Sequence, residues 1–132
     1  MADFKIIYKN HCTPQEYVTL NKRWYLDSDV KAKLTGSYLH TTSTQPSYTS
    51  SATLAASGES PVTVASSKTF VYIKNIGDAA AVISISGDYS DAYRIKLGSD
   101  ESFTSMIDTT AVVVAKSDTS TATTIEYLTA VG

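Results

Sequence analysis

Three side chains in the sequence are of the types that bind transition metals or act as nucleophiles, namely His11, Cys12 and His40. A structural zinc site needs four ligands, usually as two spaced pairs, and here two of the three candidates are adjacent in sequence. Adjacent residues of a strand point to opposite faces, so His11 and Cys12 are also poorly placed for a Cys-His nucleophilic pair. The spacing therefore disfavours both a metal site and a thiol nucleophile.

The carboxylates are equally poor candidates for catalysis. The run Asp108–Ala111 is similar to the Asp-Thr-Gly-Ala loop of aspartic proteases, but Thr110 stands where that loop needs glycine, so we predict a strand-connecting turn with Asx hydrogen bonds. Asp88 and Asp91 could offer oxygens to calcium, but the spaced acids and closing glutamate of an EF-hand loop are missing. No convergent set of acid, base and nucleophile is present, so we predict a protein that is not an enzyme and needs no cofactor.

Tyrosine is the most frequent aromatic residue, with nine in the chain. If Tyr38, Tyr48 and Tyr89 are exposed, their rings could stack on sugars, as in a carbohydrate-binding module. Tyrosines are equally common where proteins contact each other, so the composition leaves both interpretations open.

The charge of the chain excludes some partners. The net charge is −2 and the pI about 5.6, so no basic field is available for nucleic acid. Residues 1–56 carry six Lys/Arg against four Asp/Glu, and residues 57–132 carry five against nine. This asymmetry could direct the front half towards an acidic surface. One cysteine, no signal-peptide h-region and no apolar run of bilayer length predict synthesis in a reducing cytoplasm and no membrane partner.

The arrangement of apolar residues predicts an all-β protein. Alternation is clear where Ala81, Ile83 and Ile85 share one face of a strand. The runs VYIKN (71–75) and AVVVA (111–115) are apolar on both faces, which favours central strands. Gly, Asp and Ser separate short strands in the pattern of a small antiparallel β-sandwich, jelly-roll or Ig-like. The predicted strands are 62–66, 69–75, 80–86, 93–97, 101–107, 111–116 and 123–129.

The first 60 residues differ in character, so we divide the chain into an extended N-terminal arm (1–60) and a sandwich domain (61–132). Residues 40–61 are rich in Ser, Thr and Ala and read as a linker. Thr13 and Pro14 could begin a short helical turn over 14–18, with extended structure after it. The arm nevertheless contains many large apolar residues, which must be buried on their own domain or on a neighbouring chain. The residues predicted to make protein contacts are Phe4, Ile6, Tyr8, Trp24, Tyr25 and Tyr38.

Residues 68–130 resemble small β-sandwich virion proteins of tailed bacteriophages. The resemblance rests on three motifs: a YIKN-x-G hairpin strand (72–77), a G-x-x-E-S-F turn (98–103) and a closing I-E-Y-L strand (125–128). It implies a structural protein of the virion, made in the host cytoplasm, and most of all a capsid decoration (cement) protein. The implied partners are the major capsid protein, other virion subunits and further copies of the chain, with a trimer favoured. A neck, tail or fibre subunit and a surface glycan-binding module are the alternatives.

Overall fold

The computed structural model describes residues 3–26, 34–56, 61–85 and 95–132. All regular structure in these ranges is β-strand, which confirms the all-β prediction. None of the described residues form a helix that is long and apolar enough to cross a membrane. The strands are β1 (Phe4–Cys12), β2 (Gln15–Val18), β3 (Arg23–Leu26), β4 (Leu34–Thr42), β5 (Ser47–Leu54), β6 (Val62–Ser66), β7 (Phe70–Asn75), β8 (Ala81–Ser84), β9 (Ile95–Leu97), β10 (Ser102–Met106), β11 (Val112–Ser117) and β12 (Thr123–Ala130).

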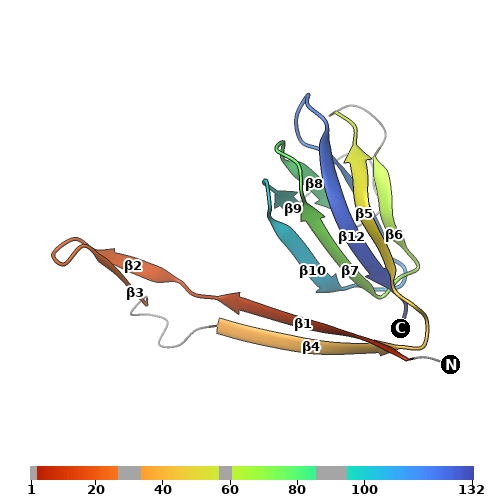
Figure 1. Cartoon of the computed structure of the whole chain (residues 1–132), viewed down its shortest axis with the longest axis horizontal. Coiled ribbons are helices and arrows are strands. Elements are labelled where there is room, and N and C mark those ends of the chain that lie inside the picture. The colour runs from red at the N-terminus through yellow and green to blue at the C-terminus, as the bar shows by residue number, and fades with distance from the viewer. Residues whose placement is uncertain (1–2, 27–33, 57–60, 86–94) are drawn as a thin grey trace. The chain divides into compact units, whose positions relative to one another are not determined.

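The eight strands from β5 to β12 form two four-stranded sheets that pack face to face (Figure 1). One sheet has the order β10-β7-β12-β5 and the other the order β6-β11-β8-β9, and all six neighbouring pairs are antiparallel. Numbered from β5, these orders are 6-3-8-1 and 2-7-4-5, the arrangement of a jelly roll. The structure thus decides between the two sandwich types that the sequence left open, in favour of the jelly roll.

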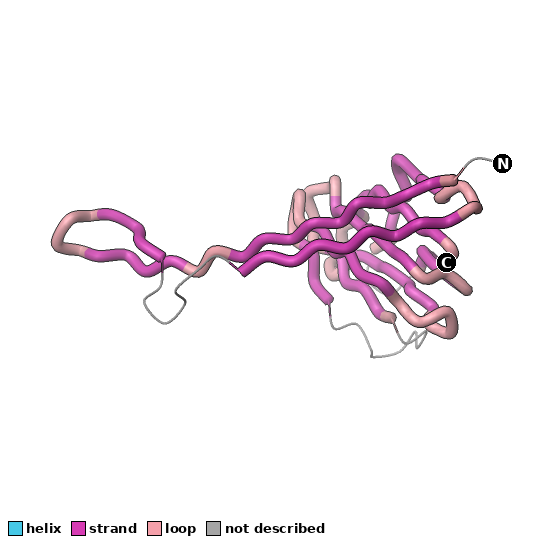
Figure 2. The backbone as a smooth tube through the Cα atoms, turned by 90° about the horizontal axis from the view of Figure 1, so that it is seen from below, coloured by secondary structure: helices cyan, strands magenta, loops and turns pink. Residues whose placement is uncertain are grey.

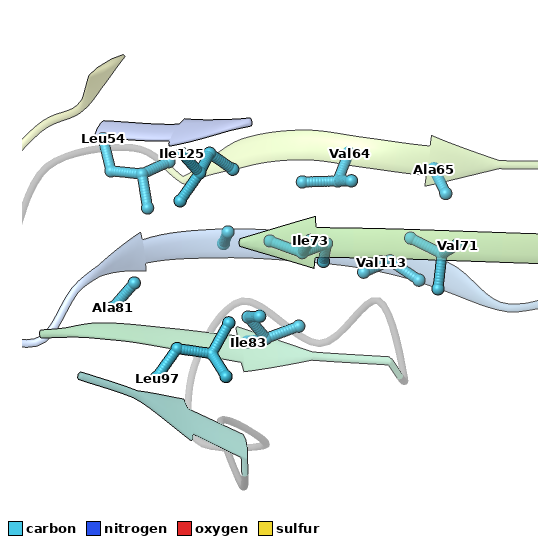
Figure 3. Close-up of a cluster of buried hydrophobic side chains, with 11 residues drawn as sticks. Leu54, Val64, Ala65, Val71, Ile73, Ala81, Ile83, Leu97, Val113 and Ile125 are labelled. Atoms are coloured by element: carbon cyan, nitrogen blue, oxygen red, sulfur yellow. The ribbon is translucent and has the colours of Figure 1, made fainter. Parts of the chain in front are cut away.

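The core lies between the two sheets and draws on both (Figure 3). Its side chains come from alternate positions of the strands, as a half-buried pleated strand requires. Strands β7 and β11 each have a neighbour on both sides, which confirms that VYIKN and AVVVA belong to central strands. The buried apolar cluster consists of Leu54, Val64, Ala65, Val71, Ile73, Ala81, Ile83, Leu97, Val113, Ala115 and Ile125.

The predicted strands after residue 61 agree with β6 to β12, with ends that differ by one or two residues. Residues 86–94, which include Asp88, Tyr89 and Asp91, lie outside the described residues, so the calcium prediction is not addressed. The structure differs from the linker interpretation of residues 40–61. Strand β5 (Ser47–Leu54) pairs with β12 and buries Leu54 completely, so this segment is part of the sandwich.

The remaining strands belong to a second compact unit, Lys5–Thr41, which we call the ribbon. In it β1 pairs with β4, and β2 pairs with β3 as an antiparallel hairpin, seen as two pairs of strands in Figure 2. Gln15–Val18 is a strand, so the helical turn proposed for 14–18 is wrong and the extended alternative is right. Among the described residues of the ribbon, neither pair of strands has a second sheet to pack against, so residues 5–26 and 34–41 form no sandwich core of their own.

Candidate functional site: the aromatic ribbon

The β2–β3 hairpin has an aromatic pair on one face. Tyr17 and Trp24 are opposite each other in the register, and their ring centroids are 5.2 Å apart with a tilt of 49° between the planes. This is the offset geometry that aromatic rings prefer. The two rings cover one another only in part, because Trp24 remains 63% exposed and Tyr17 46%. The pair is therefore organised by the hairpin while most of its surface stays available for contact.

The other face of this hairpin carries Tyr25, which is opposite Glu16 in the register. The side-chain amide of Asn21 donates a 3.0 Å hydrogen bond to the Tyr25 hydroxyl and so holds the ring beside the turn. Trp24 and Tyr25 are adjacent in one strand and point to opposite faces. The two residues that were predicted together as contact residues thus serve different surfaces.

Strand β1 alternates between half-buried and exposed side chains. Phe4, Ile6 and Tyr8 occupy the half-buried positions, whereas Ile7 is an exposed position of the opposite face. Asn10 donates a 3.2 Å hydrogen bond to the Tyr8 hydroxyl. The three residues predicted from this strand share a face, but their side chains are less accessible than those of the hairpin.

Strand β4 presents Tyr38 on the same face as His40, two residues further on. Their rings are nearly parallel, 24° between planes, at a centroid separation of 6.5 Å. Tyr38 is exposed, whereas His40 is buried. Leu34 and Leu39 are also exposed in this strand, and they lie on opposite faces of it.

The six predicted contact residues therefore all occupy strands of the N-terminal region, but the structure does not gather them on one face. Sequence analysis missed the contribution of Leu20, Leu34 and Leu39. For Leu34 and Leu39, the signal is that aliphatic residues occupy an even and an odd position of one strand, so they cannot both face the same side. For Leu20, the signal is a leucine among the turn-forming polar residues of 19–22. The large exposed hydrophobic residues of the ribbon are Ile7, Tyr17, Leu20, Trp24, Tyr25, Leu34, Tyr38 and Leu39.

The metal-ligand candidates of the ribbon are not brought together. The His11 ring nitrogen Nε2 is 2.8 Å from the Thr13 hydroxyl, and Cys12 is exposed with a free thiol. Shallow hollows beside them are lined mainly by Asn10, His11 and Thr35. Over the part of the chain that the structure describes, no group of three or more His, Cys, Asp and Glu side chains is placed to hold a metal ion.

Asp108 forms the turn that its sequence predicted. Its Oδ1 accepts hydrogen bonds from the Thr110 hydroxyl at 2.6 Å and from the Thr110 backbone N–H at 2.8 Å. These two bonds, the hydroxyl one first, hold the pKa of the Asp108 carboxyl below its ordinary value. The prediction of an Asx turn is confirmed, and the residue is an ionised carboxylate on the surface of the sandwich.

A second carboxylate of the sandwich with a lowered pKa, Glu126, lies on the outer face of the β10-β7-β12-β5 sheet. The Glu126 carboxylate accepts hydrogen bonds from Tyr48 at 2.8 Å and from Tyr72 at 2.9 Å. These bonds, that from Tyr48 first, lower the pKa of Glu126. Burial and the bond to Glu126 raise the pKa of Tyr72 to about 12, and the bond to Glu126 raises that of Tyr48. Each altered pKa thus has a structural cause in a neighbouring side chain.

The residues of the three sequence motifs, 72–77, 98–103 and 125–128, have structural roles in this sandwich. Asn75 is buried and hydrogen-bonded on all sides, and Gly77 lies where a side chain would meet the backbone of the neighbouring strand. Glu101 accepts a hydrogen bond from the Gly98 N–H at 2.5 Å and so closes the β9–β10 turn. Glu126 joins two tyrosines. Residues of all three motifs therefore make contacts that stabilise the fold.

Comparisons of the chain with protein families, with curated proteins and with solved structures found no match.

Proposed function

We propose that the chain is a non-enzymatic structural subunit of a bacteriophage virion, and that it acts there as a capsid decoration protein. The observation that carries the proposal is the ribbon, in whose described residues eight large hydrophobic side chains are exposed and no further sheet covers them. Soluble proteins leave single apolar residues exposed, but such a density on two pairs of short strands is typical of a docking surface.

The exposed apolar area of the ribbon is comparable with one side of a standard interface, and it is divided between the two faces of its strands. At about 200 Å² for each large side chain, the exposed fractions of the eight residues add up to on the order of 900 Å². A standard protein–protein interface buries roughly 800 Å² on each partner. Two-stranded hairpins are marginally stable alone, so docking would also stabilise the ribbon itself. A capsid surface or a neighbouring subunit can supply the missing half of its packing.

The sandwich suits the role of the rigid part of such a subunit. Its jelly roll is an architecture found in viral capsid proteins and also in lectins, so the fold supports the proposal by analogy alone. The strands of residues 68–130 carry the resemblance to phage virion proteins. The partners that we propose are the major capsid protein or other virion subunits, together with further copies of the chain in a homo-oligomer, with a trimer favoured.

The test is to locate the protein in particles. Phage particles released from the host that carries the gene are purified by density gradient and stained with gold-labelled antibodies against the full-length chain. Label spread over the heads, with the protein present in many copies by mass spectrometry, is the expected result. Label confined to the neck, tail or fibres would replace decoration by the alternative structural role. Particles that lack the protein altogether would overturn the virion proposal.

A second candidate function, glycan binding, is favoured by one observation on the sandwich. Tyr48 and Tyr72 are both opposite Leu128 in the register, and both donate to Glu126, so two rings are held around a carboxylate on a flat sheet face. Aromatic rings beside a hydrogen-bonding carboxylate are suited to sugars. Tyr38 belongs to the ribbon, so it is not part of this group. Binding of the full-length chain to host polysaccharide, abolished by Tyr48→Ala, is the result that would favour this function.

A further inference from the structure

The tip of the β2–β3 hairpin and an apolar hollow at the surface of the sandwich have complementary properties. We propose that the hairpin tip of one copy inserts into the hollow of a second copy, with Leu20 as the apolar anchor and Lys22 and Arg23 beside Asp108. The inference rests on the proposed assembly role and names the partner of one part of the ribbon. It makes the chain a head-to-tail oligomer.

The hairpin tip has the wrong residue for an ordinary solvent-exposed turn. The turn comprises residues 19–22 and favours small polar residues, yet it contains Leu20, whose side chain is 93% exposed. Burial of a leucine side chain contributes roughly 1.5–3 kcal/mol, and here the fold of the described residues does not use that contribution. Lys22 has a φ of 55°, a conformation in which a lysine is uncommon. The turn thus holds Leu20 outward, next to two cations.

The hollow on the sandwich has complementary properties. It is lined by Ile85, Ser105, Met106, Ile107, Asp108 and Ala111, and its volume is about 420 Å³. Most of these side chains are apolar, and Ile85 is one of the few large hydrophobic residues that the described sandwich leaves exposed, at 41%. The only carboxylate among them is Asp108, which its two bonds from Thr110 fix at the rim in ionised form. The site therefore combines an apolar floor with one negative charge.

Charge complementarity extends beyond this contact. Lys5–Thr41 contains six Lys/Arg and three Asp/Glu, a net charge of +3, while the rest of the chain contains five and ten, a net charge of −5. Opposite charges on the two units would attract the ribbon of one copy to the sandwich of another and speed their encounter at low salt. The ribbon and the hollow are different surfaces, so the contact is heterologous and produces either a closed ring or a chain of copies.

The experiment measures the self-association of the full-length protein by sedimentation velocity over a range of concentrations. Leu20→Ser should weaken association about tenfold or more, as loss of an anchor residue does. Ile76→Ser is the control, because it is a comparable change at an exposed aliphatic residue of the sandwich that belongs neither to the ribbon nor to the hollow, and it should leave association unchanged. Asp108→Asn keeps an acceptor for Thr110 but removes the charge, so it should weaken association and make it less dependent on salt.

A mixing experiment identifies the two surfaces. A chain with Leu20→Ser lacks the tip but keeps the hollow, whereas a chain with Ala111→Arg keeps the tip but fills the hollow. Neither variant should associate alone, and their mixture should form a heterodimer that does not grow further. If Ala111→Arg fails to fold, Asp108→Asn takes its place in the mixture.

The inference is overturned if the unmodified chain is monomeric at every concentration, or if Leu20→Ser associates as tightly as the unmodified chain. It is also overturned if the tip occupies the hollow of its own chain. The protein would then be a monomer, and Leu20→Ser would change its sedimentation by the same amount at every concentration. These results would leave the proposed virion role standing, because that role is judged by the location of the protein in particles. Conversely, if the protein associates head to tail but is absent from particles, the contact between copies is supported and the virion role is overturned.

Discussion

Asn75 and Thr123 meet inside the sandwich, where the Thr123 hydroxyl donates a 3.0 Å hydrogen bond to Asn75 Oδ1 across 48 residues of sequence. The same oxygen accepts from the Gly77 N–H at 3.0 Å. The Asn75 amide donates to the carbonyls of Ala79 at 2.8 Å and Leu97 at 3.0 Å. A single fully buried side chain thus satisfies polar groups of β12, of the β7–β8 loop and of the last residue of β9, and it holds one end of the jelly roll together.

Replacement of Asn75 by leucine should therefore be strongly destabilising. The substitution keeps the branched shape of the side chain but leaves the Thr123 hydroxyl and two carbonyls without this partner, while the Gly77 N–H keeps its bond to the Thr124 carbonyl. Each orphaned buried group costs about 1–3 kcal/mol, so we expect the free energy of unfolding to fall by about 3 kcal/mol or more. Urea unfolding, monitored by circular dichroism, measures this loss of free energy of unfolding. Thr123→Val removes only one bond and should cost about 1 kcal/mol; an Asn75→Leu chain no less stable than this control would contradict the argument.

Gly77 is predicted to tolerate no side chain, for reasons of space. A Cβ atom there would be 2.7 Å from the Thr124 backbone nitrogen and in still closer contact with the Thr123 hydroxyl. Gly77→Ala should lower stability by roughly 1–3 kcal/mol, since backbone has to shift. Gly36→Ala is the matched control, because its Cβ would meet only the flexible end of the Asn10 side chain. Thermal unfolding of both variants gives the comparison, and equal losses would show that space at Gly77 is not the cause.

The Tyr48–Glu126–Tyr72 group predicts a pH dependence with two arms. The pKa of Glu126 is lowered from 4.5 by its bonds from the tyrosines, so the stabilisation is present above pH 4.5 and is lost as the pH falls through the folded-state pKa. The pKa of Tyr72 is raised from 10.0 to about 12, so its stabilisation is complete below pH 10.0 and is lost as the pH rises towards 12.

The urea midpoint should therefore be highest between these limits and decline on both sides. Glu126→Gln removes the charge that both tyrosines contact, so it should flatten the acidic arm and reduce the alkaline one. Because Tyr48 is exposed and Glu126 lies on the solvent-facing side of the sheet, solvent screens the interaction, so the effect is small and is read from the shape of the profile. A profile for Glu126→Gln that is identical in shape to that of the unmodified chain would exclude this group as its origin.

Trp24 is the single tryptophan of the chain, so its fluorescence reports on the hairpin alone. Its exposed ring predicts an emission maximum typical of solvent-exposed indole and strong quenching by acrylamide in the dissociated protein. Docking of the ribbon on a virion subunit should shift the emission to shorter wavelength and reduce quenching, because water leaves the ring. The measurement loads the unmodified chain or a Trp24→Phe chain onto particles that lack the protein, takes the difference between the two as the signal of Trp24, and compares it with that of the dissociated chain. Equal quenching in both forms would exclude Trp24 from the interface.

Much of the sandwich was predictable because local pattern and tertiary position agree there. Strands β7 and β11 are apolar on both faces, and they are central. The linker interpretation failed at β5, because Ser47–Leu54 is an edge strand with small polar residues on its exposed positions. Such a sequence does not distinguish an edge strand from an unpacked segment. Its pairing with β12 includes a register shift between Ile125 and Tyr127, which no local signal announces.

In the ribbon, too, some features could be predicted from the sequence and others could not. Because adjacent residues of a strand point to opposite faces, a strand prediction is enough to place Trp24 and Tyr25 on different faces. The composition alone predicted a contact surface in the N-terminal region. The partner of each strand was not predictable, and that partner determines that Tyr17 faces Trp24 and that Leu20 is at a turn.

The sequence by itself determined the all-β class, the positions of the strands after residue 61, the aromatic character of the N-terminal region and the Asp108 turn. These properties follow from alternation, composition and hydrogen bonds between near neighbours, all of which act over a few residues. Only the tertiary structure decided the jelly-roll strand order, the place of β5, and the meetings of Asn75 with Thr123 and of Tyr48 with Glu126. Those contacts join residues 48 and 78 positions apart, and they form only when burial of the core selects one pairing of strands among many.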